Sequence, residues 1–154
     1  MQPPYNLFER AIEHEVLPYA EQNGMTTLAY GALCRGLLSG KLGVRSTFTG
    51  DDLRRTDPKF QPPRFTEYLD AVDALERFAR ERYGKSVLAL AVRFILDRGH
   101  TIALWGARHP AQLEPVPDIL GWSLDAEAMR RIDEILTEHI RHPVGPEFMA
   151  PPSP

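Results

Sequence analysis

The sequence has 154 residues, of which 43% are hydrophobic and 25% are charged. This composition predicts one globular domain with a core of its own and excludes a disordered or collagen-like chain. The net charge of −3 argues against a nucleic-acid partner, because binding to phosphates requires a basic patch. No apolar run is long enough to span a membrane, and the single cysteine, Cys34, cannot form an internal disulfide. We therefore expect a cytoplasmic protein in a reducing compartment.

The chain opens with two prolines, Pro3 and Pro4, which exclude a central strand or a helix interior at that point. Residues 1–14 are therefore expected to be irregular, with at most one short helical turn. The next stretch, 15–24, is predicted to be a short helix that ends at Gly24.

A strand is predicted over 25–30 (MTTLAY), which is short and rich in β-branched and aromatic residues. The following stretch, 31–65, is interrupted by glycine and proline, and a connection of this length is usually functional or mobile. A helix is predicted over 67–83, with Thr66 as its N-cap and Gly84 after its last turn. Its apolar face is formed by Leu69, Val72, Leu75 and Phe78.

Ser86 is expected to cap a second helix, VLALAVRFILDR, which is apolar on nearly all sides and should be deeply buried. After Gly99, residues 101–106 (TIALWG) predict a second strand whose apolar centre is typical of parallel sheets. A short helix is expected near 110–120. Either Ser123 or Asp125 should cap the last helix, whose apolar face contains Met129, Ile132, Leu136 and Ile140.

The order of strand, helices, strand and helices predicts an α/β fold with a parallel sheet. Two strands alone would leave unpaired edges and bare apolar faces, so the sequence reads as part of a larger sheet. The predicted division is a folded region, 1–142, followed by a proline-rich tail, 143–154, that is expected to be poorly ordered.

Four stretches in order resemble the C-terminal half of the aldo-keto reductases: QPPYNLFER, TTLAYGALCRGLLSGK, LWGARHPAQLE and GWSLDAEAMRRIDEI. These enzymes are (β/α)8 TIM barrels that reduce carbonyls with NADPH, and the resemblance covers roughly residues 2–140. It implies that the chain starts at the end of the sixth barrel strand. The catalytic Asp, Tyr, Lys and His of the family would then lie in the absent half, so no catalytic residue is assigned here.

The resemblance also implies a cofactor site. Tyr30 would stack on the nicotinamide ring, and Gln2 would contact its carboxamide. The residues alone instead favour Tyr30 as a strand-end aromatic that fills the core, and they leave Gln2 open as a solvated terminal side chain. The positions expected to fold over the pyrophosphate are Gly31, Leu33, Arg35 and Gly36.

A second turn, between the second strand and the next helix, matches the family's phosphate-facing turn at Gly106, Ala107, Arg108 and Gln112. Free N–H groups before a helix attract anions, and a guanidinium grips phosphate in a bidentate manner. Arg108 is therefore the candidate for the adenosine 2′-phosphate, with a solvated surface charge as the alternative, and Gln112 would reach the adenine or ribose. The sequence departs from the family at Trp105, where proline is usual, and at 115–116, where Glu-Asn is common, which puts one adenine contact in doubt.

Other chemistry finds little support. GLLSGK lacks the first glycine and the final Ser or Thr of a P-loop, so a nucleotide triphosphate site is rejected. The histidines are scattered, with only His139 and His142 close together, so no metal site is predicted. Cys34 has no His or Asp partner nearby in sequence and is interpreted as an inert thiol.

The leading hypothesis is the cofactor-binding half of an NADPH-dependent aldo-keto reductase, inactive alone and acting on a carbonyl substrate only in a complete barrel. It would need an N-terminal half as a partner, with no nucleic acid or membrane involved. The alternative is a non-catalytic half-barrel that self-associates or binds nucleotides through its exposed strand edges. A weaker third reading is a degraded remnant without a function of its own.

Overall fold

The structure is a computed structural model, and it describes residues 1–145. The predicted tail therefore lies mostly outside the described residues. The strands are β1 (Thr27–Ala29) and β2 (Thr101–Ala103). The α-helices are α1 (Val16–Gln22), α2 (Arg64–Tyr83), α3 (Val87–Leu96), α4 (Val116–Ile119) and α5 (Ala126–His139). Short 3-10 turns are η1 (Ala11–Glu13), η2 (Cys34–Ser39), η3 (Leu53–Arg55), η4 (Pro58–Phe60) and η5 (Pro110–Leu113).

The two strands form a parallel pair in which Leu28 lies opposite Ile102, as the α/β pattern predicted. Each strand is shorter than its predicted range, because only three residues of β1 pair in regular register with three residues of β2. Pairing nevertheless continues past the strand ends: Leu104 N–H donates to the Ala29 carbonyl (2.8 Å), and Ala32 N–H donates to the Leu104 carbonyl (3.2 Å). The two strand ends thus leave the sheet side by side.

The N-terminal segment lies along the other edge of β1. Leu28 N–H donates to the Met1 carbonyl (2.9 Å), and Tyr30 N–H donates to the Pro3 carbonyl (3.1 Å). A parallel bridge joins Pro4 to Tyr30. The segment acts as a third, irregular strand, and its prolines lie at an edge of the described sheet, where proline is tolerated.

The helices begin and end largely where the sequence signals lie. Ser86 accepts a hydrogen bond from Ala89 N–H (3.2 Å) and caps α3, and Gly84 adopts φ +66° after α2, as predicted. The predicted cap at Thr66 is wrong: α2 starts at Arg64, after Pro63, and makes no side-chain cap. Asp125, rather than Ser123, caps α5 by accepting from Ala128 N–H (2.8 Å).

The helix predicted near 110–120 is divided into η5 and α4. Pro115 lies between the two elements, and because proline has no backbone N–H it cannot donate the hydrogen bond that would continue η5 into α4. The stretch 31–65, predicted to be a long connection, contains η2, η3 and η4. Such short turns carry no hydrophobic periodicity that a sequence could show.

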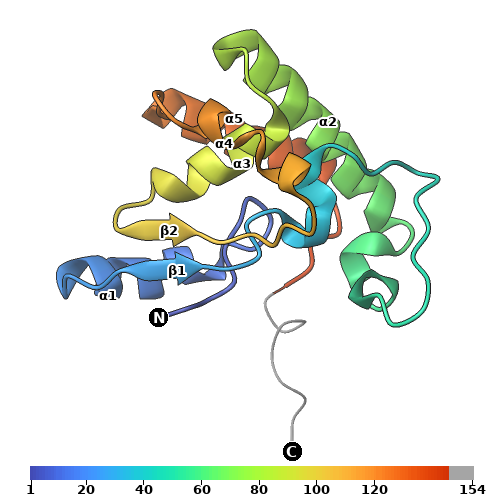
Figure 1. Cartoon of the computed structure of the whole chain (residues 1–154), viewed down its shortest axis with the longest axis horizontal. Coiled ribbons are helices and arrows are strands. Elements are labelled where there is room, and N and C mark those ends of the chain that lie inside the picture. Colours follow the sequence, from blue (N-terminus) through green and yellow to red (C-terminus); the bar gives the residue numbers. More distant parts are fainter. Residues whose placement is uncertain (146–154) are drawn as a thin grey trace, which may run out of the picture.

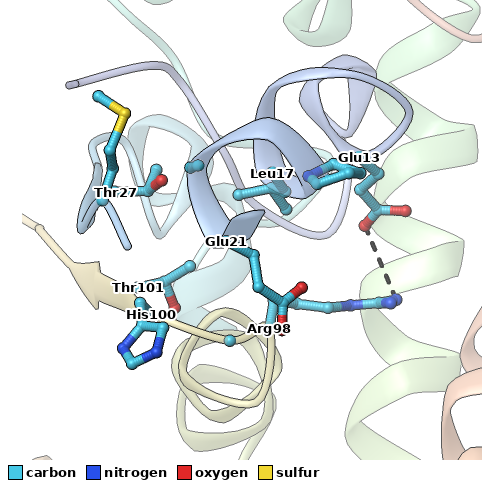
Figure 2. Close-up of a pocket in the computed structure, with 11 residues that line it drawn as sticks. Glu13, Leu17, Glu21, Thr27, Arg98, His100 and Thr101 are labelled. Carbon is cyan, nitrogen blue, oxygen red and sulfur yellow. Dashed lines mark ion pairs between the residues drawn. The ribbon is translucent and has the colours of Figure 1, made fainter. Parts of the chain in front are cut away.

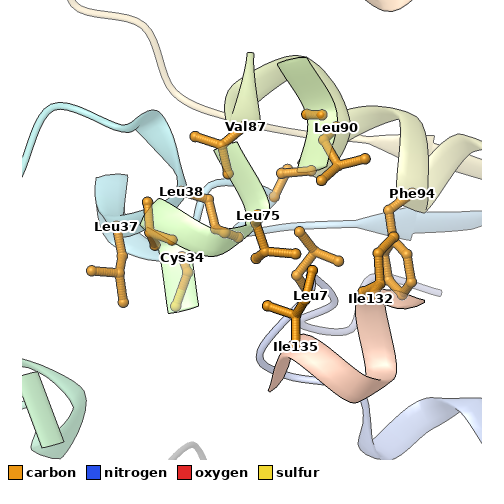
Figure 3. Packing of buried hydrophobic residues seen from close by; sticks show 14 of the residues in the cluster. Leu7, Cys34, Leu37, Leu38, Leu75, Val87, Leu90, Phe94, Ile132 and Ile135 are labelled. Carbon is orange, nitrogen blue, oxygen red and sulfur yellow. The ribbon is translucent and has the colours of Figure 1, made fainter. Parts of the chain in front are cut away.

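Figure 1 shows α2, α3, α4 and α5 grouped on one side of the two strands. The core between them is built on α3, whose predicted deep burial is confirmed: eight of its ten residues are buried. Leu75 of α2, Leu90 of α3 and Ile132 of α5 meet there with Leu7 and Leu38 (Figure 3). The predicted faces of α2 and α5 both join this core. In the described part of the chain, no helix is long and apolar enough to cross a membrane.

Candidate functional site

The predicted cofactor residues gather at one edge of the sheet. β1 leads into the turn 31–36 and β2 leads into the turn 106–112, and the strands are parallel, so both turns start at the same edge. The hydrogen bonds between Ala32 and Leu104 and between Leu104 and Ala29 bring these starts together. Ligands of parallel α/β sheets bind at this carboxyl edge.

The first turn has a left-handed backbone. Gly31 has φ +72° and Gly36 φ +87°, while the non-glycine residues Cys34 and Arg35 have φ +46° and +53°. Leu33 is partly buried and packs against a cluster formed by buried residues of α3 and by Ile119 of α4. The Arg35 guanidinium forms an ion pair with the buried Asp57 (Nη1–Oδ2 3.2 Å).

The second turn is exposed and is stabilised by one of its own side chains. Gly106, Ala107 and Arg108 are all exposed. Gln112 Oε1 accepts hydrogen bonds from the backbone N–H groups of Arg108 (2.5 Å) and His109 (3.1 Å). The side chain predicted to reach the adenine or ribose thus holds the turn that carries Arg108.

Arg54 belongs to the same region and was missed by the sequence analysis. A Cβ added at Gly36 would meet the Arg54 Nη1 atom at 3.9 Å, so this guanidinium lies beside the first turn. Its partner is Asp52 (Nη2–Oδ2 2.6 Å), and it also lies over the Phe48 ring (4.3 Å). Hydrogen bonds from Arg54, with a further contribution from the charge of Arg108, lower the pKa of Asp52 to about 2. No spacing in the sequence indicates this contact, which depends on the folding of the whole stretch 31–65.

Gln2 and Tyr30 share the face of the sheet that points away from the buried side of β1. Thr27 and Ala29 are buried, whereas Leu28 and Tyr30 point to the opposite face, because side chains alternate along a strand. Tyr30 is 37% exposed, and the neighbouring Ile102 of β2 is 47% exposed. Hydrogen bonds of Met1 and Pro3 to β1 fix the backbone on both sides of Gln2.

A cavity of about 230 Å³ lies at the opposite end of the strands (Figure 2). Met25 and Thr27 line it at the start of β1, and His100 and Thr101 line it at the start of β2. None of the predicted cofactor residues belongs to its lining. The cavity is therefore not the candidate site.

Two further features bear on the chemistry of the site: the Cys34 thiol and the arrangement of side chains that can bind metals. Burial raises the pKa of the Cys34 thiol well above its usual range, which opposes formation of the reactive thiolate. Within residues 1–145, no group of three or more His, Cys, Asp or Glu side chains is placed to hold a metal ion.

Comparison with known protein families identifies the chain. The model of the aldo/keto reductase family matches residues 1–137. The chain belongs to this family. The aldo-keto reductase YhdN of Bacillus subtilis (strain 168) is 62% identical to it over 154 residues, which are 99% of this chain and 46% of YhdN.

Solved structures of aldo-keto reductases have the same fold. The glycerol dehydrogenase AKR11B4 of Gluconobacter oxydans superimposes with a TM-score of 0.87 at 56% identity, covering 97% of this chain and 45% of that one. An aldo-keto reductase of Klebsiella pneumoniae in complex with NADPH has a TM-score of 0.59 at 20% identity, covering 88% and 38%. The second similarity shows the fold alone. The chain spans about half the length of the relatives it matches.

The residues at the carboxyl edge fit the dinucleotide that the family implies. A Cβ at Gly31 or Gly106 would meet nothing within 4 Å, so the surface beside both turns is open to a ligand. Arg54, which lies beside Gly36 of the first turn, and Arg108, which follows Gly106 in the second turn, supply two guanidinium groups, and guanidinium groups suit phosphate oxygens. The roles assigned to the individual cofactor residues remain predictions.

Proposed function

We propose that this chain is the cofactor-binding part of an NADPH-dependent aldo-keto reductase, corresponding to the C-terminal part of a (β/α)8 barrel. Family membership and the similarity to solved aldo-keto reductases support this assignment. The observation that carries the proposal is the meeting of two glycine-containing turns and two arginines at the carboxyl edge of one parallel strand pair.

In this proposal, each part of the edge has a separate task. Arg108, on the exposed second turn, binds the 2′-phosphate, and Arg54 with the first turn binds the diphosphate. Tyr30 and Gln2 hold the nicotinamide over the exposed sheet face. The bound cofactor supplies the hydride for carbonyl reduction, and the chain's own residues orient it.

The chain alone supplies no assigned proton donor, so we expect it to bind cofactor without turning over a carbonyl substrate. Tyr30 is proposed as a stacking surface and not as an acid. In this proposal the catalytic residues belong to the N-terminal half of the barrel, which would have to pair with this C-terminal part. We propose this pairing because the sheet face around Ile102 is exposed and, within residues 1–145, no strand pairs with the outer edge of β2.

Fluorescence titration of NADPH into the purified 154-residue chain tests the proposal, with NADH titrated in parallel. We expect saturable NADPH binding and weaker NADH binding, because only NADPH carries the 2′-phosphate that Arg108 can grip. Substitution Arg108→Ala should weaken NADPH binding about tenfold and leave NADH binding nearly unchanged, since a charge-assisted bidentate contact is worth about 1.5–3 kcal/mol.

Arg130→Ala is the matched control, because Arg130 is an exposed arginine on α5. It removes the same charge from the protein at a site outside the carboxyl edge. A folded chain that binds neither dinucleotide would contradict the proposed function. Equal loss of affinity in both variants would show that net charge, and not the Arg108 contact, determines binding.

The exposed sheet face favours one alternative, a non-catalytic half-barrel that associates with a second copy of itself. Ile102 is 47% exposed at the centre of its strand, and Leu28 lies opposite it in the register. Apolar side chains in the middle of a strand are usually covered. Sedimentation velocity of the chain with and without NADPH distinguishes the alternatives, because self-association would be concentration-dependent and independent of the cofactor.

A further inference from the structure

A series of polar contacts around buried Asn6, Asp57 and Lys59 connects the two ends of the first turn. At one end, Asn6 Nδ2 donates to the Gly31 carbonyl (3.0 Å) and also to Glu9 Oε2 (2.6 Å). The other oxygen of Glu9 accepts from Lys59 Nζ (3.0 Å). The contacts therefore run from the turn to the N-terminal segment and on to η4.

The same series of contacts returns to the first turn through Asp57. Lys59 Nζ lies 3.2 Å from Asp57 Oδ1, and Asp57 Oδ2 lies 3.2 Å from Arg35 Nη1. Asp57 Oδ1 also accepts from the Lys59 backbone N–H (3.0 Å). The contacts thus form a closed circuit, which we call the buried circuit: Gly31, Asn6, Glu9, Lys59, Asp57 and Arg35.

Burial makes the circuit costly to open. Asn6 and Asp57 are fully buried, and Lys59 is 2% exposed. Burial acts to lower the pKa of Lys59, but neighbouring charges, including Glu9 and Asp57, raise it above its usual value, so the side chain stays charged. Removing one partner from such a group leaves a buried charge uncompensated.

The buried circuit surrounds a part of the backbone that has an unfavourable, left-handed conformation. Within residues 1–145, Cys34 and Arg35 are the non-glycine residues with φ in the left-handed region. L-residues avoid this region, and such conformations persist where the surrounding structure enforces them. Arg35 is held at the guanidinium by Asp57 and by the Leu53 carbonyl (3.3 Å).

We infer that Asp57 and Arg35 form a latch that keeps the turn 31–36 left-handed, so that Arg35 serves cofactor binding through the position of this turn and not by contacting phosphate. Arg35 and Asp57 are thus positioning residues, and the inference rests on the proposed cofactor-binding function. The diphosphate contact on this side then belongs to the turn's backbone and to Arg54. The family resemblance places Arg35 over the pyrophosphate, whereas in the latch its side chain acts only through the backbone of the turn.

Two double variants separate a latch from a direct phosphate contact: Arg35→Gly with Asp57→Asn, and Arg35→Ala with Asp57→Asn. Both lack the guanidinium and the carboxylate, and they differ only in the backbone preference at position 35. Glycine enters the left-handed region freely, whereas alanine populates it about tenfold less. Because apparent affinity scales with the population of the competent turn, we expect the glycine variant to bind NADPH within about twofold of the unsubstituted chain and the alanine variant about tenfold more weakly.

Direct phosphate contact predicts a different result. Both double variants would then lose affinity equally, and the salt dependence of the dissociation constant would become shallower in both, because one screened charge contact is missing. That outcome would overturn the latch. Asp57→Asn alone should also weaken NADPH binding. Asparagine has one acceptor oxygen instead of two, so it cannot accept from both Arg35 and Lys59.

Arg45→Gly and Arg45→Ala are the matched controls. Arg45 is an exposed arginine in the same stretch, its φ is outside the left-handed region, and it has no part in the circuit. The two control variants should bind NADPH alike, which shows that glycine and alanine differ only where the left-handed backbone is required. If the variants at Asp57 do not fold, as judged by circular dichroism, the single variants Arg35→Gly and Arg35→Ala make the same comparison.

Amide hydrogen exchange, measured without cofactor, tests the latch separately from the proposed cofactor binding. Gly36 N–H and Leu38 N–H both donate to the Leu33 carbonyl (2.9 and 3.1 Å), so their hydrogen exchange reports on the turn. The alanine double variant should exchange these amides about tenfold faster than the glycine double variant. Equal exchange in the two would overturn the latch even if neither binds NADPH.

Discussion

The side chain of Gln112 holds the backbone of Arg108: its Oε1 atom accepts the Arg108 N–H at 2.5 Å and the His109 N–H at 3.1 Å. These N–H groups precede η5 and would otherwise lack a partner inside the turn. The proposed 2′-phosphate ligand is thus carried by a turn whose shape depends on a neighbouring amide.

Substituting Gln112 should therefore affect the turn before any cofactor is present. Gln112→Ala removes the acceptor, and we expect faster amide exchange at Arg108 and His109 and about fivefold weaker NADPH binding, in line with the loss of an N-terminal cap. Gln112→Glu keeps an acceptor oxygen and should leave the amide exchange slow, while its negative charge next to Arg108 weakens NADPH binding more than NADH binding. Unchanged exchange of the Arg108 and His109 amides in Gln112→Ala would show that the Gln112 side chain does not stabilise the turn.

Much of this fold follows from local patterns in the sequence. The cap at Ser86, the left-handed Gly84 and the apolar face of α2 are each encoded within a few residues, and each was found where it was predicted. The cap at Thr66 was not, because Pro63 already starts α2 one turn earlier. A local signal is reliable only when a second one nearby does not compete with it.

The site was only partly predictable. The two turns follow predicted strands, so their shared edge is a consequence of parallel pairing. Arg54 was not foreseen, because its place beside Gly36 depends on how three short 3-10 turns fold the stretch 31–65. The pairing of Lys59 with Glu9, fifty residues apart in sequence, has no local signature either. Long-range ionic contacts leave no periodicity for a sequence analysis to detect.

The cap of α3 gives a direct stability test. Ser86→Ala removes the acceptor for Ala89 N–H and should lower the free energy of unfolding by about 1 kcal/mol. Thr66→Ala is the matched control, because Thr66 lies inside the first turn of α2 and does not cap it. Its free energy of unfolding should be unchanged or slightly higher, since alanine favours a helix more than threonine does. Urea unfolding at neutral pH measures both. A loss in Thr66→Ala as large as that in Ser86→Ala would contradict the observed start of α2.

Glu13 should make the protein sensitive to acid. Burial alone would raise the pKa of Glu13, but hydrogen bonds from Arg10 and the Tyr5 hydroxyl lower it below its ordinary value of 4.5. A lowered folded-state pKa contributes stability that is present above pH 4.5 and is lost as the pH falls through the folded-state value. Glu13→Gln should therefore be less stable at pH 6, with a flatter decline of the urea midpoint between pH 5 and pH 3.

The control for Glu13 is Glu15→Gln, which changes an exposed glutamate two residues away. It should retain both the stability at pH 6 and the steep acid decline of the unsubstituted chain. A Glu13→Gln variant whose urea midpoint falls as steeply as that of the unsubstituted chain would show that the contacts of Glu13 do not stabilise its charged form.

The exposed sheet face makes a prediction about association that is independent of the cofactor. Ile102→Gln replaces an apolar side chain that is 47% exposed in the middle of β2, opposite Leu28. If two copies cover this face, burying the exposed half of this side chain contributes about 0.7–1.5 kcal/mol in each copy, and the substitution should weaken self-association about tenfold in sedimentation velocity. Val44→Gln is the matched control, because Val44 is 73% exposed in the stretch 31–65 and away from the sheet. If both variants associate like the unsubstituted chain, the face is not a contact between copies, and pairing with the N-terminal half of the barrel becomes the explanation for its apolar character.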